Sequence, residues 1–198
     1  MVEKAISLSL PLKEQDIVRL KAGDRVLLTG VLYTARDAAH KRLVEALERG
    51  EKLPIDLKGQ VLYYMGPSPA PPGKVIGSAG PTSAYRMDRY TPRLLQAGLR
   101  GMIGKGPRSE KIKEALKQHK AVYLAATGGA GALLSQRILK AEVVAYADLG
   151  PEAIRKLEVK DLPALVINDT HGGDLYLEGR EKYRRQGSQT NSKAHNAG

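Results

Sequence analysis

The stretch RVLLTGVLYTARDAAHKRLVEALERG, residues 25–50, decides the fold class because an apolar strand pattern passes directly into a helical one. Residues 25–34 form a largely apolar run, which is typical of a buried strand. The remainder repeats apolar side chains on one helical face, at Ala39, Leu43 and Leu47. A strand that feeds a helix is the repeating unit of α/β proteins, so this stretch predicts that class.

Strand and helix patterns continue to alternate along the chain, and Thr91 and Ser109 are the expected N-caps of two helices. The central strands are almost continuous apolar runs, which indicates a sheet covered by helices. The first 25 residues and the proline-rich stretch 66–73 do not fit a purely parallel winding, so we expect a mixed sheet flanked by helices. Further strands are expected at 60–66, 74–80, 99–106, 121–126, 142–147 and 164–169, and further helices at 91–98, 109–119, 131–140 and 151–159.

The composition excludes several kinds of site within this chain. There is no cysteine, which excludes disulfides, a thiolate nucleophile and an iron–sulfur site ligated by cysteine. The four histidines lack the spacing of metal ligands, so no metal site is predicted, and a partner chain would carry any metal. These histidines are His40, His119, His171 and His195.

Charge and hydropathy limit the partners and the location of the protein. The N-terminal sequence lacks the apolar segment of a signal peptide, and no stretch approaches the ~20 apolar residues of a membrane span, so we expect a cytoplasmic protein. The net charge of +11 indicates either an anionic ligand or only solubility and a basic tail. We expect one domain over 1–183 and a disordered polar and basic tail over 184–198.

The first of three unusual loops is TARD, residues 34–37. Thr34 is expected to cap the following helix, which places Arg36 in the first helical turn. The helix dipole disfavours a cation there by roughly a few tenths of a kcal/mol. Arg36 is therefore either an exposed side chain tolerated at low cost or, together with the free N–H groups, a ligand for a carboxylate or phosphate.

The other two loops also follow expected strands. In GPTSAYRMD, residues 80–88, Thr82 and Ser83 begin a short helical segment, and Arg86 lies one turn further on. The two hydroxyls are either simple N-caps or part of a binding site at the carboxyl end of a strand. In IGKG, two glycines flank Lys105, which is either a solvated turn lysine or an ammonium group directed at an anion. This loop does not match the Walker pattern.

A single shared anion explains the three loops better than three separate ligands. Two arginines and one lysine suit a small dicarboxylate. A nucleic acid would require a wider basic surface with stacking aromatic side chains, so a nucleic-acid-binding module remains only a distant alternative.

Five segments of the chain resemble the β subunit of class I, iron–sulfur-dependent fumarate hydratase. The C-terminal domain of the single-chain forms and the L(+)-tartrate dehydratase β subunit belong to the same family. The blocks T-x-RD-x-x-H and GPTS-x-x-RMD are the most specific parts of the resemblance, which extends from about residue 5 to residue 183. The five segments are LLTGVLYTARDAAHKRL, YMGP, GSAGPTSAYRMDRYTPRLL, GMIGKG and LPALVINDTHGGDLY.

The resemblance implies roles for residues in all three loops. It implies that Arg36, Arg86 and Lys105 bind the substrate carboxylates and that Thr82 is the catalytic base. Ser83 stands where the family commonly has a second threonine, and it keeps a hydroxyl for substrate binding.

The resemblance also implies a swivelling β/β/α domain and an α subunit that carries a [4Fe-4S] cluster on three cysteines. The implied reaction is the reversible hydration of fumarate to L-malate, a step of the tricarboxylic acid cycle, in an α2β2-type assembly. This chain would be inactive alone, and a carboxylate of the α subunit would activate Thr82. A tartrate dehydratase β subunit and a structural subunit without catalytic residues are the alternatives.

Overall fold

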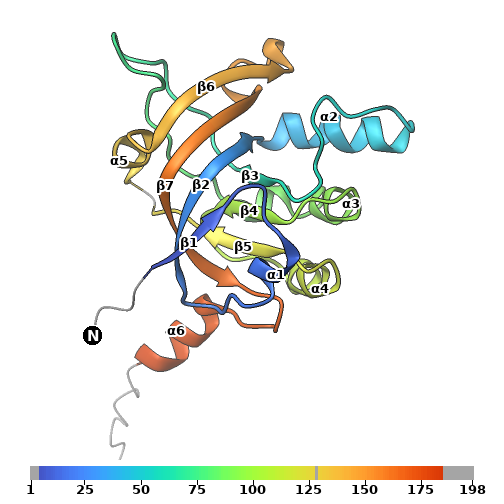
Figure 1. Cartoon of the computed structure of the whole chain (residues 1–198). Helices are drawn as coiled ribbons and strands as arrows, with labels where there is room; N and C mark the ends of the chain where they lie inside the picture. The colour runs from blue at the N-terminus through green and yellow to red at the C-terminus, as the bar shows by residue number, and fades with distance from the viewer. Residues whose placement is uncertain (1–4, 128, 185–198) are drawn as a thin grey trace, which may run out of the picture.

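The computed structural model describes residues 5–127 and 129–184, where one mixed sheet has the strand order β1-β2-β3-β4-β5-β7-β6 (Figure 1). The strands are β1 (Ile6–Ser9), β2 (Arg25–Thr34), β3 (Val61–Tyr63), β4 (Gly101–Gly104), β5 (Val122–Ala125), β6 (Ile138–Ala145) and β7 (Ile154–Asn168). The α-helices are α1 (Glu14–Ile17), α2 (Asp37–Glu48), α3 (Thr91–Gln96), α4 (Glu110–Gln118), α5 (Gly131–Ser135) and α6 (Leu175–Tyr183). Two 3₁₀ helices are η1 (Ala84–Met87) and η2 (Ala147–Glu152).

Strand β7 closes the sheet into a ring. Strands β1 to β5 pair in parallel, in sequence order. Strand β7 is 15 residues long and runs antiparallel to β2, β5 and β6. Because β7 pairs with both β2 and β5, the strands β2, β3, β4, β5 and β7 form a closed circuit of backbone pairing.

A bulge bends β2 in the middle of its long pairing with β7, between Leu28 and Gly30. Gly30 has a φ of +129°, and a Cβ added there would lie 2.8 Å from the carbonyl oxygen of Leu10. Glycine is therefore required at this position, because any side chain would be strained and would also meet the backbone.

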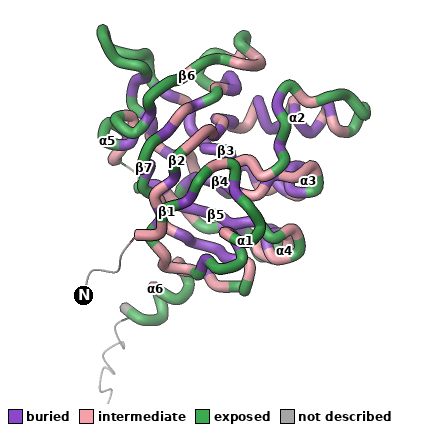
Figure 2. Tube along the Cα trace, viewed as in Figure 1, coloured by how far each residue is buried: buried purple, intermediate pink, exposed green. Residues whose placement is uncertain are grey.

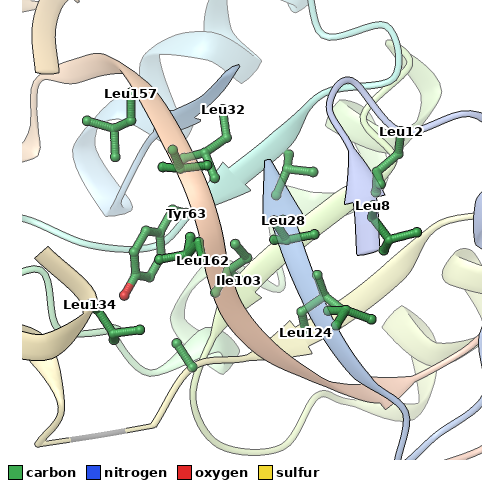
Figure 3. Close-up of a cluster of buried hydrophobic side chains, with 14 of the residues drawn as sticks. Leu8, Leu12, Leu28, Leu32, Tyr63, Ile103, Leu124, Leu134, Leu157 and Leu162 are labelled. Carbon is green, nitrogen blue, oxygen red and sulfur yellow. The ribbon is translucent and has the colours of Figure 1, made fainter. Parts of the chain in front are cut away.

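The curvature produces three layers with two separate apolar cores. Alternate residues of β3 and of the position after it face opposite sides: Val61 and Tyr63 enter one core, whereas Leu62 and Tyr64 enter the other. The first core lies between β3–β5 and the layer of β1, β2 and β7 (Figure 3). The second lies between β3–β5 and helices α2, α3 and α4. Buried segments accordingly run along the middle strands, whereas much of β6 and α6 is exposed (Figure 2). The β/β/α layering, with a mixed sheet flanked by helices, is confirmed.

Several expected elements are wrong. Residues 74–80 form no strand, because the loop folds on itself: Ser78 N–H donates to Ser68 Oγ at 2.9 Å. The helix expected at 131–140 ends at Ser135, and β6 begins at Ile138. The helix expected at 151–159 is instead the end of η2 followed by β7. Helix α6 is not anticipated by the sequence patterns.

The two expected N-caps also act differently from the prediction. Helix α3 has Tyr90 as its N-cap, and the hydroxyl of Thr91 donates to the carbonyl of Met87 at 2.9 Å. Ser109 does occupy the N-cap position of α4, but its side chain makes no capping hydrogen bond.

Within the described ranges, no helix combines the length and the apolar character needed to cross a bilayer. Of the expected tail at 184–198, only Arg184 is described, and it is the C-cap of α6. The predicted disorder of the remaining tail falls outside the described residues.

Candidate functional site

The three loops singled out in the sequence meet at one edge of the sheet. Strands β2, β3 and β4 are parallel neighbours, with Tyr33 paired to Leu62 and Tyr63 paired to Ile103. Their carboxyl ends therefore lie side by side, and this is the edge where α/β sheets bind ligands.

The Thr82 loop and the Lys105 loop are joined by backbone hydrogen bonds. Lys105 N–H donates to the carbonyl of Thr82 at 3.1 Å, and Ala84 N–H donates to the carbonyl of Lys105 at 2.8 Å. Ser83 pairs with Lys105 as an isolated parallel bridge. Thr82 N–H donates to the carbonyl of Tyr64 at 2.6 Å, just beyond β3. The Thr82–Ser83 segment thus lies between the ends of β3 and β4, and the side chain of Lys105 is exposed beside it.

Arg86 joins this pair of loops to the start of α2. It lies in η1, and its Nε donates to Oδ1 of Asp37 at 2.9 Å. Asp37 is the first residue of α2 and directly follows Arg36. The five predicted site residues therefore lie at one edge of the sheet. The Lys105 loop is bonded to the segment of Thr82 and Ser83, and Arg86 bonds to Asp37, the neighbour of Arg36. Tyr85 points outward and is 65% exposed.

The expected capping box at the start of α2 is wrong. Thr34 is buried, and its hydroxyl donates to the carbonyl of Ala153 at 3.2 Å and accepts from Arg155 N–H at 3.0 Å. Arg36 is itself the N-cap residue, and the helix starts at Asp37. The cap comes from η2 instead, because Oε2 of Glu152 accepts from Ala38 N–H at 2.9 Å. The hydroxyl of Thr34 is therefore bound to the chain at the start of β7 and does not cap α2.

The guanidinium of Arg36 lies in a partly buried position. Its Nη2 is 3.5 Å from Oε1 of Glu152, and the side chain is 22% exposed. Its Nε is buried and has no hydrogen-bond partner among the described residues. Gly66 lies against it, since a Cβ added there would be 2.8 Å from Nη1 of Arg36. The positive charge at this helix start is offset by the carboxylates of Glu152 and Asp37.

His40, in the first turn of α2, is hydrogen-bonded to the backbone of Arg36. Its Nδ1 donates to the carbonyl of Arg36 at 2.9 Å, and its ring lies edge-on to Tyr64 at a centroid distance of 5.1 Å. Burial lowers the pKa of His40 to about 4, so the imidazole is neutral near pH 7. In the sequence, His40 is the last residue of the block T-x-RD-x-x-H, but no role follows from the pattern itself. Its spacing of four residues after Arg36 was the available signal.

Arg108 is a second residue that the sequence reasoning missed. It follows the Lys105 loop, its side chain is 0% exposed, and its Nε donates to Oδ1 of Asp88 at 2.7 Å. The burial of an arginine in a loop depends on tertiary packing, and no sequence pattern indicated it.

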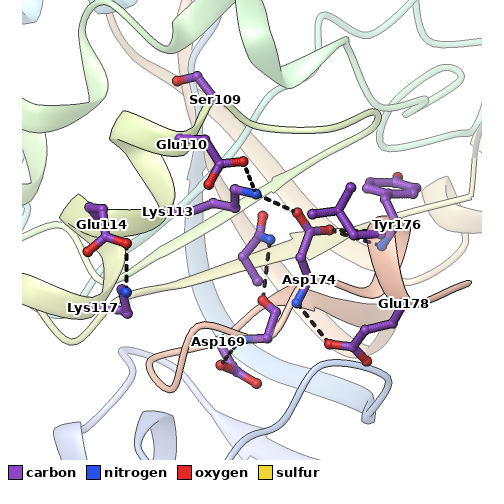
Figure 4. A network of polar contacts seen from close by, with 12 residues as sticks. Ser109, Glu110, Lys113, Glu114, Lys117, Asp169, Asp174, Tyr176 and Glu178 are labelled. Atoms are coloured by element: carbon purple, nitrogen blue, oxygen red, sulfur yellow. Dashed lines mark hydrogen bonds and ion pairs between the residues drawn. The ribbon is translucent and has the colours of Figure 1, made fainter. Parts of the chain in front are cut away.

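Helix α6 contacts the Lys105 loop through Tyr176. Figure 4 shows the junction between α6 and α4. Asp174 caps this helix, accepting from Tyr176 N–H at 3.0 Å, and it pairs with Lys113 of α4 at 2.9 Å. The hydroxyl of Tyr176 then accepts from Gly106 N–H at 3.2 Å. The α4–α6 junction therefore holds the glycine that follows Lys105.

No metal site is assembled by the residues that the structure places. Across 5–127 and 129–184, no group of three or more His, Cys, Asp or Glu side chains could hold a metal ion. The whole chain contains no cysteine, so it offers no thiolate to an iron–sulfur cluster. The site residues of this chain therefore do not fit a [4Fe-4S] cluster as ligands.

The comparisons with known proteins identify relatives over most of the chain. The family model described as fumarase C-terminus matches residues 2–179. The aerobic class I fumarate hydratase of Salmonella typhimurium is 41% identical over 177 residues, covering 87% of this chain and 30% of that protein. Fumarate hydratase 2 of Leishmania major is 40% identical over 165 residues, covering 82% of this chain and 29% of that protein.

A shorter relative matches over nearly its whole length. The putative L(+)-tartrate dehydratase subunit beta of Methanocaldococcus jannaschii is 37% identical over 177 residues, covering 86% of this chain and 91% of that protein. The chain thus spans about a third of the length of the fumarate hydratase relatives and most of the length of this subunit.

Proposed function

The chain belongs to the fumarase C-terminus family, and on this premise we propose that it is the β subunit of a class I fumarate hydratase. With an α subunit it catalyses the reversible hydration of fumarate to L-malate. The similarity to a relative named subunit beta, which covers 91% of that protein, supports the assignment as a β subunit. An α2β2-type assembly, as the family resemblance implies, is part of the proposal.

The basic side chains at the sheet edge bind the two carboxylates of the substrate. The observation that carries this assignment is the joining of three loops, by the backbone bonds between Thr82 and Lys105 and by the ion pair of Arg86 with Asp37. Among the described residues, Arg86 bonds to Asp37 through Nε, so its two Nη groups are available for a bidentate contact with a carboxylate. Charges held in place in this way stabilise the additional negative charge that develops on a substrate carboxylate during proton removal.

Thr82 transfers the proton, and the hydroxyl of Ser83 helps to orient the substrate. The hydroxyl of Thr82 makes no hydrogen bond to another described residue, so it is available to the substrate. A free threonine hydroxyl is a very weak base, and activation therefore has to come from a carboxylate of the α subunit.

We assign the [4Fe-4S] cluster to the α subunit. This chain contributes no thiolate, and none of its residues is assigned to the cluster. The division of labour is then simple: the β subunit binds the carboxylates and moves the proton, and the α subunit holds the cofactor.

Substitution of Arg36 tests the proposal. In the assembled enzyme, Arg36→Ala should lower kcat/KM for L-malate by at least ~100-fold, because the loss of a charged ligand to a bound anion costs about 3 kcal/mol. Arg42→Ala is the matched control, since Arg42 lies on the same helix but pairs with Asp148 at the surface. A near wild-type rate in Arg36→Ala removes Arg36 from the site, and an assembled wild-type pair without hydratase activity rejects the proposed function.

A tartrate dehydratase β subunit is the second candidate, and the nearly full-length match to the relative of that name favours it. Both reactions remove water from a 2-hydroxy dicarboxylate. The assembled pair should therefore be assayed on L-malate and L(+)-tartrate in parallel, and the larger kcat/KM identifies the substrate.

A further inference from the structure

Arg108 is a buried cation whose presence packing alone does not explain. Its side chain is 0% exposed, although a charged group loses several kcal/mol of hydration when it is buried. An apolar side chain of similar volume is often as stabilising as a buried ion pair, or more so. Stability is therefore a weak reason for an arginine at this position.

The contacts of Arg108 join the two loops of the candidate site. Arg108 follows Lys105 by three residues, and its Nε donates to Oδ1 of Asp88 at 2.7 Å. Asp88 follows Arg86 by two residues. Its other carboxylate oxygen accepts from Ser109 N–H at 3.0 Å. Both oxygens of Asp88 are thus bound by the segment that continues from the Lys105 loop.

The rest of the guanidinium contacts the ends of β3 and α3. Its Nη1 donates to the hydroxyl of Tyr64 at 3.3 Å, and its Nη2 donates to the hydroxyl of Thr91 at 2.7 Å. The carbonyl of Tyr64 in turn accepts from Thr82 N–H. Arg108 therefore contacts the residue whose backbone fixes Thr82.

An aromatic ring holds the same loop from the other side. The guanidinium carbon of Arg108 lies 5.2 Å from the ring centroid of Tyr123, whose hydroxyl donates to the carbonyl of Gly106 at 2.8 Å. The hydroxyls of Tyr123 and Tyr176 thus both bond to the backbone of Gly106, next to Lys105.

We propose that Arg108 is a positioning residue that fixes Lys105 relative to Thr82 and Arg86, through its contacts with Asp88 and Tyr64. It does not touch the substrate. The guanidinium is needed because it donates to Asp88, Tyr64 and Thr91 at the same time. The single ammonium group of lysine cannot make these three hydrogen bonds in the same geometry. This inference rests on the proposed role of Lys105 and Arg86 as ligands of one dicarboxylate.

The first test uses Arg108→Lys and Arg108→Met in the assembled enzyme. Both should raise KM for fumarate by about tenfold or more, because misplaced ligands weaken binding of the dicarboxylate. Arg100→Lys is the control: Arg100 donates to the carbonyls of Leu95 and Leu99 near the opposite end of β4. Its KM should change by less than about twofold. A purely structural role would lower the amount of active enzyme, and thus apparent kcat, with KM unchanged; that result overturns the proposal.

A double-mutant cycle shows whether Arg108 acts through Lys105. The increase in KM caused by Arg108→Lys should be clearly smaller in a Lys105→Ala background, because the ligand that it misplaces is already gone. The same fold-increase in both backgrounds overturns the positioning role.

A second measurement does not depend on catalysis and uses the full chain alone. The amides of Lys105 and Ala84 form the hydrogen bonds between the two loops, so their hydrogen exchange reports whether the loops stay together. In Arg108→Lys, and in the isosteric Asp88→Asn, both amides should exchange about tenfold faster or more. The amide of Val122, bound to the carbonyl of Arg100, should be unchanged.

The two measurements separate the possible failures. Unchanged exchange at Lys105 and Ala84 in both variants overturns the role of Arg108, whatever the activity. An inactive wild-type assembly with faster exchange in both variants rejects the proposed function but leaves Arg108 as the residue that joins the two loops.

Discussion

Arg36 is electrostatically unfavourable at the start of α2, yet it has a proposed function there. As the N-cap of α2 it brings a positive charge to the end of the helix that already carries about half a positive charge. Two carboxylates, Glu152 and Asp37, reduce that cost, yet Nε of Arg36 remains buried without a partner among the described residues. A helix start built for stability alone would use a small polar cap. The arrangement is therefore better explained by an anion that contacts Arg36.

Thr82 is the residue for which the structure removes an alternative. The sequence left open that Thr82 merely caps a helix, but the N-cap of η1 is Ser83, and the hydroxyl of Ser83 makes no capping bond. Thr82 contributes to this loop through its backbone N–H and carbonyl, which every residue type except proline provides.

Substitutions of Thr82 should consequently affect catalysis rather than folding. Thr82→Ala should lower kcat by ~10²–10⁴ with little change in KM, because the hydroxyl acts in the transition state. Thr82→Ser should keep part of the activity, since it retains the hydroxyl but loses the methyl group that restricts its rotamer. Steady-state kinetics of both variants with the wild-type α subunit measure this. An unchanged kcat in Thr82→Ala contradicts the proton-transfer role.

His40 should make the stability of the protein depend on pH. Its pKa is about 4 when folded, against an ordinary value of 6.5, so the unfolded chain binds the proton first. The stability that follows from keeping this ring neutral is fully present above about pH 6.5 and is lost as the pH falls towards 4. The expected loss is about 2 kcal/mol of unfolding free energy between pH 7 and pH 5.

Chemical denaturation of the wild type and of His40→Asn at several pH values checks this. The side-chain amide of the introduced asparagine can still donate to the carbonyl of Arg36 but does not titrate. Any difference between the two proteins in how the unfolding free energy changes with pH is therefore due to the imidazole. The variant should be less stable at pH 7 and should lack the loss attributed to His40. Equal pH slopes in both proteins contradict the assignment.

The candidate site was largely predictable because its signals are local. Arg36 and Lys105 follow β2 and β4 closely, and the parallel order of β2, β3 and β4 brings these two ends together. The loop of Thr82 and Arg86 follows no strand at 74–80, and its backbone bonds to Tyr64 and Lys105 bring it to the same edge. Glu152 was not predictable, because it reaches the start of α2 from η2, more than 110 residues further along the chain. The same holds for the burial of Arg108.

At the scale of elements, the sequence predicts the helices and strands whose apolar residues recur at a regular spacing. Helices α2 and α4 and strands β2 to β5 lie within the expected ranges. The end of β7 lies within the strand expected at 164–169, but its first part was wrongly expected to be a helix. These first residues pair on both sides, with β2 and β6, and their buried positions Ile154, Leu157 and Val159 resemble a helical spacing. Tertiary pairing, rather than local propensity, decides the conformation there.

The segment between β3 and the Thr82 loop contributes one glycine to the site. A Cβ on Gly66 would lie 2.8 Å from Nη1 of Arg36 and 3.0 Å from the carbonyl oxygen of Pro151. The backbone must therefore pass close beneath the guanidinium, and only glycine leaves that space.

Gly66→Ala should displace Arg36 without removing it. We expect KM for L-malate to rise about tenfold, with a stability loss of about 1–2 kcal/mol from the close contact with the backbone. Gly179→Ala in α6 is the control, because a Cβ there meets nothing within 4 Å. Kinetics and thermal unfolding of both variants provide the measurement. An unchanged KM in Gly66→Ala shows that Arg36 can move aside at no cost.

At the scale of the whole molecule, this chain is expected to be one part of an enzyme. Purified alone, it should fold but show no iron–sulfur absorbance after anaerobic reconstitution, because it has no thiolate to hold the cluster. Hydratase activity should appear only when the α subunit is added. The ultraviolet–visible spectrum and iron content before and after addition measure this, and a stoichiometric cluster on the lone chain contradicts the proposal.

The ring closed by β7 also determines when this domain can fold on the ribosome. Thr29 of β2 bonds to Asp161 of β7, 132 residues away, and β5 also pairs with β7. At a synthesis rate of ~5–20 residues per second, about 7 to 26 s pass between the synthesis of Thr29 and that of its partner Asp161. During that interval the nascent chain exposes apolar surfaces of the sheet that β7 later closes. The apolar faces of β2 are therefore without their antiparallel neighbour for most of the time that the domain is being synthesised.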